Sequence, residues 1–529
     1  MFLAEFSTIT TATPPDASLR RGSSTLHLLT ASVQSASGQP NPAPISRFSL
    51  APYWPSEQWR TSTPEAQGID SAQLVQMFDF IQQHNLDLHS LLIVRHGYLV
   101  TDAYFQPFQA DRVHDIASCA KSVISALAGA AIDHGYLEGV DQKLLDFFPT
   151  RTIANLDARK QAITLDHLLT MSAGFAWDEW RPTDAQSTFF QLSASRDQIQ
   201  FVLDRPMTDD PGKRWNYNSG LPTVLGRIIQ DTSGIDIQSF AQRYLFEPLG
   251  INALIHVYNP STAMNIALTP HDMAKFGYLY LQQGAWDGKP VLSPAWVQAS
   301  TSDHVHAMGG QDYGYFWWLP SYGGYEAGGD GGQRIIVLPE QDMVVVITAG
   351  LTYPDMETVP DQLVQDYILP AVKSPDALPP NTQATAQLEA QLETITQPEP
   401  KPIAPLPSTS TRISDQRYAL TANSIGLEDF ALSFSVQEAA INMSFGGQSQ
   451  QLAIGLDNTY RITPLTPSGP LYGWMAMKGT WQNANTFTLH LMMTGVVRNL
   501  IFEFQDKTVT VWYLGSRGER EQIDGTLVR

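Results

Sequence analysis

From residue 71 to residue 369 the chain alternates between short apolar runs and longer stretches of helical periodicity. Apolar runs at 91–94 and 98–100 flank a short turn, and so do runs at 334–338 and 343–347. Each pair predicts a β-hairpin, and the second is apolar enough to lie inside a sheet. Helices are predicted between and after these hairpins, at 118–134, 221–231, 270–283 and 360–369. Strands at both ends with helices between them predict one sheet built from the two ends of this region, beside a mostly helical part.

The remaining segments differ in composition. Residues 1–50 are rich in Ser, Thr, Ala and Pro and predict a disordered N-terminal tail. Residues 375–412 carry many prolines and predict a stiff, extended linker. From 413 to 529 apolar residues alternate with polar ones, as at Phe487, Leu489 and Leu491, which predicts a small all-β sandwich or barrel. We therefore expect an α+β domain over 51–374 and a separate β domain over 413–529.

The charge of the chain excludes two classes of partner. Thirty-two basic residues against 52 acidic ones give a formal net charge of −20, and such a surface repels nucleic acid and anionic membranes. No apolar run is long enough to span a bilayer. No signal peptide is expected, because the N-terminus lacks a basic stretch followed by an apolar one, and a cytoplasmic or an exported location both stay open. The single cysteine, Cys119, allows no intramolecular disulfide.

The segment Ser118-Cys119-Ala120-Lys121 suggests nucleophilic chemistry. Residues three apart on a helix share one face, so the Lys121 amine is expected beside the Ser118 hydroxyl. At a helix start the Ser118 N–H is free to bind a developing oxyanion, and the helix dipole adds positive potential there. Residues 123–132 are nearly all apolar or small, so we expect a buried helix in which Lys121 loses its charge and takes the serine proton. The alternative is a chance pair on a solvated helix face.

Residues 116–122 resemble the nucleophile motif of serine β-lactamases, penicillin-binding proteins and related esterases. Tyr217-Asn218-Ser219 resembles the Tyr-x-Asn motif of the class C β-lactamase and family VIII esterase branch. Ser219 stands where that motif has its Asn. Residues 329–333 occupy the place of the third motif, which is usually Lys-Thr-Gly or His-x-Gly. The resemblance covers residues 54–373. It implies a β-lactamase/transpeptidase-like fold, an antiparallel sheet flanked by helices plus a helical region.

The resemblance also assigns roles to residues. Ser118 is the expected nucleophile, Lys121 its base, and Tyr217 the group that relays the proton to the leaving group. The N–H groups of Ser118 and Gln333 are the expected oxyanion hole. Substrate-binding positions are expected at Ser219, Asp330, Gly331 and Gly332. The C-terminal β domain resembles the lipocalin-like barrels appended to some of these hydrolases.

These assignments predict a serine hydrolase that cleaves an ester or amide of a small molecule or peptide through an acyl-serine intermediate. Asp330 stands where Lys or His is usual and repels a substrate carboxylate, so a carboxylesterase or amidase is favoured over an efficient β-lactamase. Two alternatives stay open: a D-amino-acid peptidase acting on cell-wall-like peptides, and a catalytically silent scaffold for peptide binding or assembly. The sequence has no metal-ligand spacing and no nucleotide-binding motif, so neither metal nor cofactor is expected. The oligomeric state is not predicted.

Overall fold

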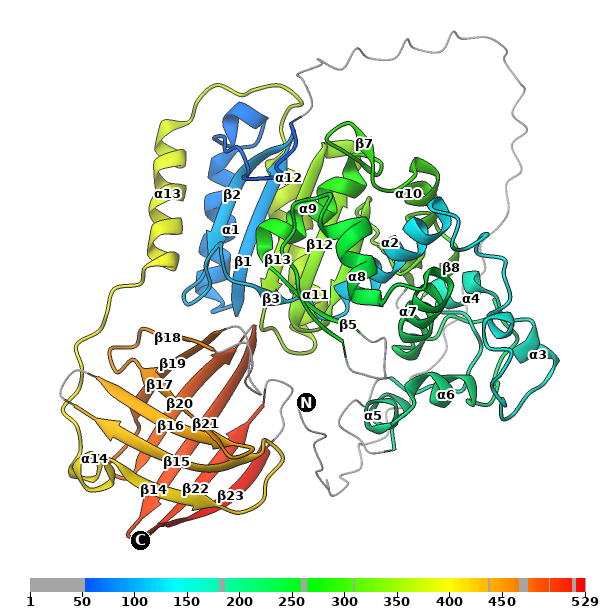
Figure 1. The fold of residues 1–529 in the computed structure, drawn as a ribbon. Coiled ribbons are helices and arrows are strands. Elements are labelled where there is room, and N and C mark those ends of the chain that lie inside the picture. The colour runs from blue at the N-terminus through cyan, green and yellow to red at the C-terminus, as the bar shows by residue number, and fades with distance from the viewer. Residues whose placement is uncertain are drawn as a thin grey trace, which may run out of the picture.

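The computed structural model describes residues 53–179, 186–257, 264–307, 310–435, 438–465, 474–493, 495–515 and 520–528. The tail predicted at 1–50 lies outside these residues. Figure 1 shows a mixed helix-and-sheet domain followed by a barrel-like domain made of strands. Within the described part of the chain, no helix has both the length and the apolar composition needed to cross a membrane.

The main domain is built on an eight-stranded sheet with the order β2-β1-β13-β12-β11-β10-β9-β8. β1 pairs antiparallel with β13, with Leu91 opposite Ile347, so strands from the two ends of the domain lie at its centre. Both strands are buried along their whole length, which accounts for their continuous apolar runs. The two predicted hairpins and the predicted single sheet are therefore confirmed. The strands are β1 (Leu88–Arg95), β2 (Tyr98–Tyr104), β8 (Val305–His306), β9 (Asp312–Tyr313), β10 (Trp318–Leu319), β11 (Tyr325–Gly329), β12 (Gln333–Leu338) and β13 (Met343–Ala349).

Helices cover both faces of this sheet. One core cluster joins α1 (Ser71–Gln83) and η7 (Leu363–Ile368) to one face of the central strands, and a second joins α2 (Cys119–Asp133) and α9 (Pro270–Leu281) to the other. The predicted helices at 118–134, 221–231 and 270–283 are all present. The remaining helices of the domain are α3 (Ala158–Gln161), α4 (Leu165–Leu169), α5 (Thr188–Ala194), α6 (Gln198–Leu203), α7 (Gly220–Ser233), α8 (Ile237–Ala241), α10 (Pro294–Ser300), α11 (Asp355–Gln362) and α12 (Leu369–Ala371).

Two smaller sheets complete the main domain. The larger has three strands in the order β3-β5-β4, and β3 precedes α2 directly in the chain. The smaller is a two-stranded hairpin after α9. Their strands are β3 (His114–Asp115), β4 (Leu254–Val257), β5 (Met264–Leu268), β6 (Ala285–Trp286) and β7 (Lys289–Pro290).

The prediction of an extended linker is wrong for part of 375–412. Residues Thr382–Thr396 form the helix α13, which lies beside α1 in Figure 1. The Leu388 side chain is buried in the core under α1, and Gln391 Nε2 donates to Asp79 Oδ1 at 2.6 Å. The prolines lie outside Thr382–Thr396, and within it Ala, Leu, Gln and Glu favour a helix. An apolar stripe then holds the helix against the main domain.

The C-terminal domain is a ten-stranded antiparallel sheet in the order β17-β16-β15-β14-β23-β22-β21-β20-β19-β18. A bridge between Gly455, directly after the edge strand β17, and Lys478 of β19, beside the opposite edge, makes the sheet a nearly closed barrel, as the alternating pattern predicts. Phe487, Leu489 and Val511 are fully buried in its core. A short helix, α14 (Ser408–Ile413), precedes the strands β14 (Gln416–Leu420), β15 (Leu427–Phe434), β16 (Ala439–Phe445), β17 (Gln448–Ile454), β18 (Arg461–Pro464), β19 (Trp474–Trp481), β20 (Thr486–Met493), β21 (Val496–Gln505), β22 (Thr508–Leu514) and β23 (Arg520–Leu527).

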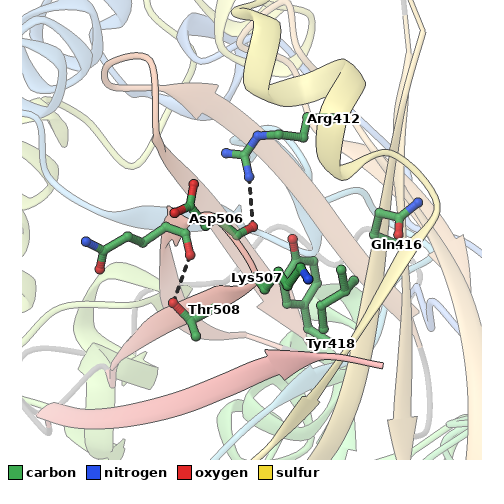
Figure 2. Close-up of a pocket in the computed structure, with 8 residues that line it drawn as sticks. Arg412, Gln416, Tyr418, Asp506, Lys507 and Thr508 are labelled. Atoms are coloured by element: carbon green, nitrogen blue, oxygen red, sulfur yellow. Dashed lines mark hydrogen bonds between the residues drawn. The ribbon is translucent and has the colours of Figure 1, made fainter. Parts of the chain in front are cut away.

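A hollow lies at one end of this barrel, beside α14 and the β21–β22 turn (Figure 2). Arg412 Nη1 donates to the Asp506 carbonyl at 2.8 Å, and Thr508 Oγ1 donates to the Gln505 carbonyl at 2.8 Å. β21 begins at Val496 and ends at Gln505, so this hollow and residue 495 lie at opposite ends of the strand.

Candidate active site

Ser118 and Lys121 meet at the start of α2. Ser118 is the N-cap residue of the helix, and Lys121 lies in its first turn. Lys121 Nζ donates to Ser118 Oγ at 2.8 Å, and both side chains are half-buried. At this distance a proton can pass from the hydroxyl to a neutral amine. The rest of the helix is deeply buried, so the pair is held on a rigid element.

The turn before Ser118 has an unusual backbone. Ala117 has a φ of 48°, in the left-handed region that residues with a β-carbon seldom adopt. Such a conformation costs about 1 to 3 kcal/mol and persists only where the surroundings enforce it. Asp115 Oδ1 accepts from the Ala117 N–H at 2.8 Å, and the Ile116 N–H donates to the Ile266 carbonyl at 3.1 Å. These bonds fix the direction in which the Ser118 side chain leaves the backbone.

Tyr217 lies beside Lys121, in the loop that leads to α7. Lys121 Nζ lies 4.7 Å from the centroid of the Tyr217 ring. That ring stacks on Trp318, with centroids 6.2 Å apart, and contacts Trp215, with centroids 5.9 Å apart, so two tryptophans hold it in place. The structure therefore brings together the three residues predicted to be catalytic.

Ser219, two residues after Tyr217, is held by a carboxylate. Ser219 Oγ donates to Glu179 Oε1 at 2.5 Å, and the Ser219 N–H donates to Glu179 Oε2 at 3.1 Å. Trp177 Nε1 donates to the same Oε2 at 2.6 Å. Three donors therefore fix Glu179 next to the second motif, in a half-buried position.

The third motif forms the turn between β11 and β12. Gly329 ends β11 against the nucleophile turn: a β-carbon on it would lie 2.7 Å from the Ile116 carbonyl oxygen and 3.0 Å from the Ser118 nitrogen. Asp330 is half-buried in the turn that follows. Gly331 and Gly332 have φ angles of 78° and 88°, which explains why both are glycine.

Gln333 lies at the start of β12, and its side chain bonds to the turn and to the end of β13. Its Nε2 donates to the Ala349 carbonyl at 2.7 Å, and its Oε1 accepts from the Ala349 N–H at 3.1 Å. The structure thus uses the Gln333 side chain to join β12 to the end of β13. The residue whose backbone lies against Ser118 is Gly329.

A buried ion pair supports this turn from behind. Arg334 Nε lies 3.1 Å from Glu326 Oε1, and both side chains are almost fully buried. Burial disfavours the charged guanidinium, but the carboxylates of Glu326 and Glu357 outweigh it and raise the pKa of Arg334. Arg334 Nη1 donates to the Gly329 carbonyl at 3.3 Å and to the Gln333 carbonyl at 3.0 Å. The guanidinium therefore ties the end of β11 to the start of β12.

These motifs lie inside a region with a known family pattern. The sequence model described as "Beta-lactamase" matches residues 76–367, more than half of the chain. The chain belongs to the beta-lactamase family. The match runs from α1 to η7 and contains the nucleophile turn, Tyr217 and the β11–β12 turn.

Several individual proteins are similar to parts of the chain. The chain is 28% identical over 158 residues to ML-236A carboxylate methylbutanoyltransferase of Penicillium citrinum, which is 27% of this chain and 38% of that protein. It is 22% identical over 291 residues to 6-aminohexanoate-dimer hydrolase of Paenarthrobacter ureafaciens, 50% of this chain and 73% of that protein. An octameric penicillin-binding protein homologue from Pyrococcus abyssi has 14% identity and a TM-score of 0.45, covering 85% of this chain and 99% of that one. The chain thus spans well under two thirds of the first relative's length.

Two features of this beta-lactamase-family site were not predicted from the sequence. Glu179 reaches Ser219 from a loop 40 positions upstream, and nothing in the local sequence marks it. The Arg334–Glu326 pair was not predicted either, because the two residues lie on different strands and only the folded sheet brings them together. The available signal was an arginine placed directly before the apolar run 335–338.

Among the residues that the structure describes, one group of side chains could hold a metal ion. Asp303, His306 and Asp312, on and beside the β8–β9 hairpin, place one possible ligand atom each within 4.8 Å of one another. Asp303 and His306 are exposed and Asp312 is half-buried, and His306 Nδ1 lies 2.5 Å from Asp312 Oδ1 as an ion pair.

Proposed function

We propose that the protein cleaves an ester or amide through an acyl-enzyme on Ser118. The observation that carries the proposal is the 2.8 Å contact between Lys121 Nζ and Ser118 Oγ at the N-terminus of α2. It pairs a nucleophile with a base at the positive end of a helix dipole. A methylbutanoyltransferase and a hydrolase among the relatives agree with acyl transfer to an acceptor or to water. A silent scaffold would not need this contact.

In the first step neutral Lys121 takes the Ser118 proton while Oγ attacks the substrate carbonyl carbon. The new C–O bond leaves a negative charge on the carbonyl oxygen. As the bond to the leaving group breaks, the Tyr217 hydroxyl gives its proton to the leaving alkoxide or amine and takes up the serine proton from Lys121, whose amine lies over its ring. Water or another hydroxyl compound then attacks the acyl-serine by the reverse sequence, and Ser118 regains its proton.

The oxyanion needs two backbone donors near Ser118. The Ser118 N–H is one of them, since it lies at the start of α2. For the second we propose the backbone of β11 at Gly329 instead of Gln333, because Gly329 is the residue that packs against the Ser118 nitrogen. The Arg334 guanidinium, bound to the Gly329 carbonyl, keeps that backbone in place.

The charges around the site favour particular substrates. Glu179 lies next to Tyr217-Asn218-Ser219, and Asp330 lies in the turn after Gly329. We propose that these two carboxylates disfavour substrates with a carboxylate near the scissile bond, which includes most penicillins. Neutral esters, and amides that carry an ammonium group, fit the site better.

A fluorophosphonate probe tests the nucleophile. The wild type should be labelled once, on Ser118, and Ser118→Ala should lose both labelling and ester hydrolysis. Ser125→Ala is the matched control, since Ser125 is a buried serine on the same helix and lies outside the site. It should be labelled like the wild type. Labelling that persists in folded Ser118→Ala, at another serine, would show that the proposed mechanism is wrong.

A further inference from the structure

The segment that joins β2 to α2 lies under the C-terminal barrel. Phe108, in this segment, is buried in a small apolar cluster whose other members are Trp474, Ala476 and Met492 of the barrel. The rings of Phe108 and Trp474 meet edge to face with centroids 5.4 Å apart. Figure 1 shows the β18–β21 end of the barrel below β1 and β3. The main domain and the barrel therefore share a core at this place.

Two contacts reach the last residues before the nucleophile turn. Trp474 Nε1 donates to the Val113 carbonyl at 3.2 Å. Gly495, at the turn between β20 and β21, lies against the His114 ring so closely that a β-carbon on it would come within 2.1 Å of a ring atom. The barrel thus touches residues 113 and 114 directly, four to five positions before Ser118.

His114 is fixed by partners on both ring nitrogens. Its Nδ1 lies 2.7 Å from the Asp115 carbonyl, which only accepts, so Nδ1 carries the hydrogen. In the neutral ring Nε2 then accepts from His89 Nδ1, 2.8 Å away. Phe108 stacks on His89 with ring centroids 3.9 Å apart. The cluster in the main domain against which the barrel docks therefore has a single defined arrangement of hydrogen bonds.

The contact continues from His114 to the nucleophile. The backbone of His114 and Asp115 pairs with β5, and the Asp115 side chain accepts from the Ala117 N–H at 2.8 Å. That bond holds Ala117 at its positive φ, and Ser118 follows. A shift of His114 moves Asp115, and with it the strained turn that aims the Ser118 hydroxyl at Lys121.

The other end of the same segment is also held by the C-terminal part of the chain. The Gln106 N–H donates to the Ile395 carbonyl at 3.1 Å, and Thr396 Oγ1 donates to the Tyr104 carbonyl at 3.1 Å. Both partners lie at the end of α13. Residues 104–114 are therefore clamped by α13 at their start and by the barrel at their end.

We propose that the C-terminal barrel positions the nucleophile, with Gly495 and Trp474 acting through His114 and Asp115 on the turn at Ala117. The inference rests on the proposed role of Ser118. In this proposal the barrel contributes to catalysis without binding a ligand. Its contact with the main domain stabilises the backbone conformation in which Ser118 Oγ lies beside Lys121 Nζ. Gly495 and Trp474 are positioning residues, since neither contacts Ser118 or Lys121 in the structure.

The test uses the full chain with Gly495→Ala and Trp474→Phe. The alanine β-carbon collides with His114, and the phenylalanine keeps an aromatic ring but loses the bond to Val113. For both we expect kcat for a neutral ester and the rate of fluorophosphonate labelling to fall by about tenfold to a hundredfold, the effect of a small misplacement of a reacting group. KM should stay close to the wild-type value. Amide hydrogen exchange should speed up in a peptide spanning residues 113–122.

Gly447→Ala is the matched control. Gly447 also has a positive φ in a barrel turn, but open space lies around it, so this variant carries the backbone strain without the collision. It should keep the wild-type labelling rate. If Gly495→Ala or Trp474→Phe is folded and labels Ser118 as fast as Gly447→Ala does, the barrel does not position the nucleophile. If the wild type is not labelled on Ser118, the proposed function itself fails first.

Discussion

The Lys121 amine lies over the Tyr217 ring, with its nitrogen 4.7 Å from the centre of the ring. An amine over an aromatic ring is attracted by the ring's negative face, so this contact helps to hold the Lys121 side chain beside Ser118. The contact to Ser118 requires a neutral lysine at the moment of attack. Tyr217 therefore touches the proposed base directly, in addition to its proposed role of relaying the proton.

We expect Lys121→Ala and Tyr217→Phe each to lower kcat for a neutral ester by about a hundredfold or more, as general acid–base catalysis typically contributes. The double variant should be little worse than either single one, because the groups act as a unit. Steady-state kinetics of the three variants measures this. Unchanged turnover in Tyr217→Phe, or losses that multiply, would remove Tyr217 from the proton path.

Asp330 controls selectivity by charge in our interpretation. Two like charges 4 Å apart repel by about 4 kcal/mol at an effective dielectric of 20, and by less where water reaches them. Asp330→Asn should therefore raise kcat/KM for an anionic ester relative to its neutral analogue by about tenfold or more, since about 1.4 kcal/mol corresponds to tenfold. Glu340→Gln removes one charge at the far, exposed end of β12 and should leave the ratio unchanged. An equal effect of Asp330→Asn on both substrates would contradict the idea.

Among the contacts of the site, the sequence predicted those between residues close together in the chain. Ser118 and Lys121 share one helical turn, so their contact follows from the geometry of a helix. The approach of Tyr217 could be expected only through the family resemblance, since 96 positions separate it from Lys121. Gln333 and Gly329 face each other across the β11–β12 pair, and the sequence could not tell which of the two lies against Ser118.

The β11–β12 turn is the element on which the oxyanion hole depends. Gly329→Ala should lower kcat by about a hundredfold to a thousandfold, the usual effect of losing one oxyanion donor, because its β-carbon pushes β11 away from Ser118. Gly234→Ala serves as the control for a glycine replaced in open space: Gly234, at the end of α7, has no atom within reach of an added β-carbon, although its φ is positive whereas that of Gly329 is −140°. Burst kinetics with a chromogenic ester would separate slow acylation from slow release. A Gly329→Ala enzyme with a normal burst would exclude β11 from the oxyanion hole.

Helices and strands were predicted correctly where the pattern of apolar residues in the sequence matches the residues that the fold buries. The strands β1, β12 and β13 are largely apolar because both of their faces are covered, and α2 is apolar because it is central. α13 was missed because the prolines on either side dominated the composition of the segment. Its few apolar side chains, Leu388 among them, find a surface on α1 that no local pattern reveals.

The contact between the two domains should make the stability of the whole molecule depend on pH. Burial, together with the neighbouring His89, lowers the pKa of His114 to about 3, and the bond to the Asp115 carbonyl only partly opposes this. In the unfolded chain a histidine has a pKa of about 6.5 and binds a proton below that pH, whereas folded His114 stays neutral. The free energy of unfolding should therefore fall as the pH drops from about 6.5 towards 3, by up to about 1.4 kcal/mol per pH unit.

Other groups titrate over the same range, so the measurement is a difference. Denaturant unfolding of the wild type and of His114→Gln, from about pH 7 to about pH 4, isolates the contribution of this ring. The stability advantage of the wild type should shrink steadily as the pH falls. A constant difference between the two proteins would show that His114 takes up its proton equally in the folded and unfolded states.

The pairing of β1 with β13 also determines the order in which the chain can fold during synthesis. Leu91 lies opposite Ile347, so β1 leaves the ribosome long before its central partner exists. Until then the β1–β2 hairpin presents an open apolar edge, which invites pairing with another nascent chain. Contacts this distant in sequence form slowly, because a long loop must close first. The release of the β12–β13 hairpin from the ribosome is therefore the event that closes the sheet and ends this exposure to aggregation.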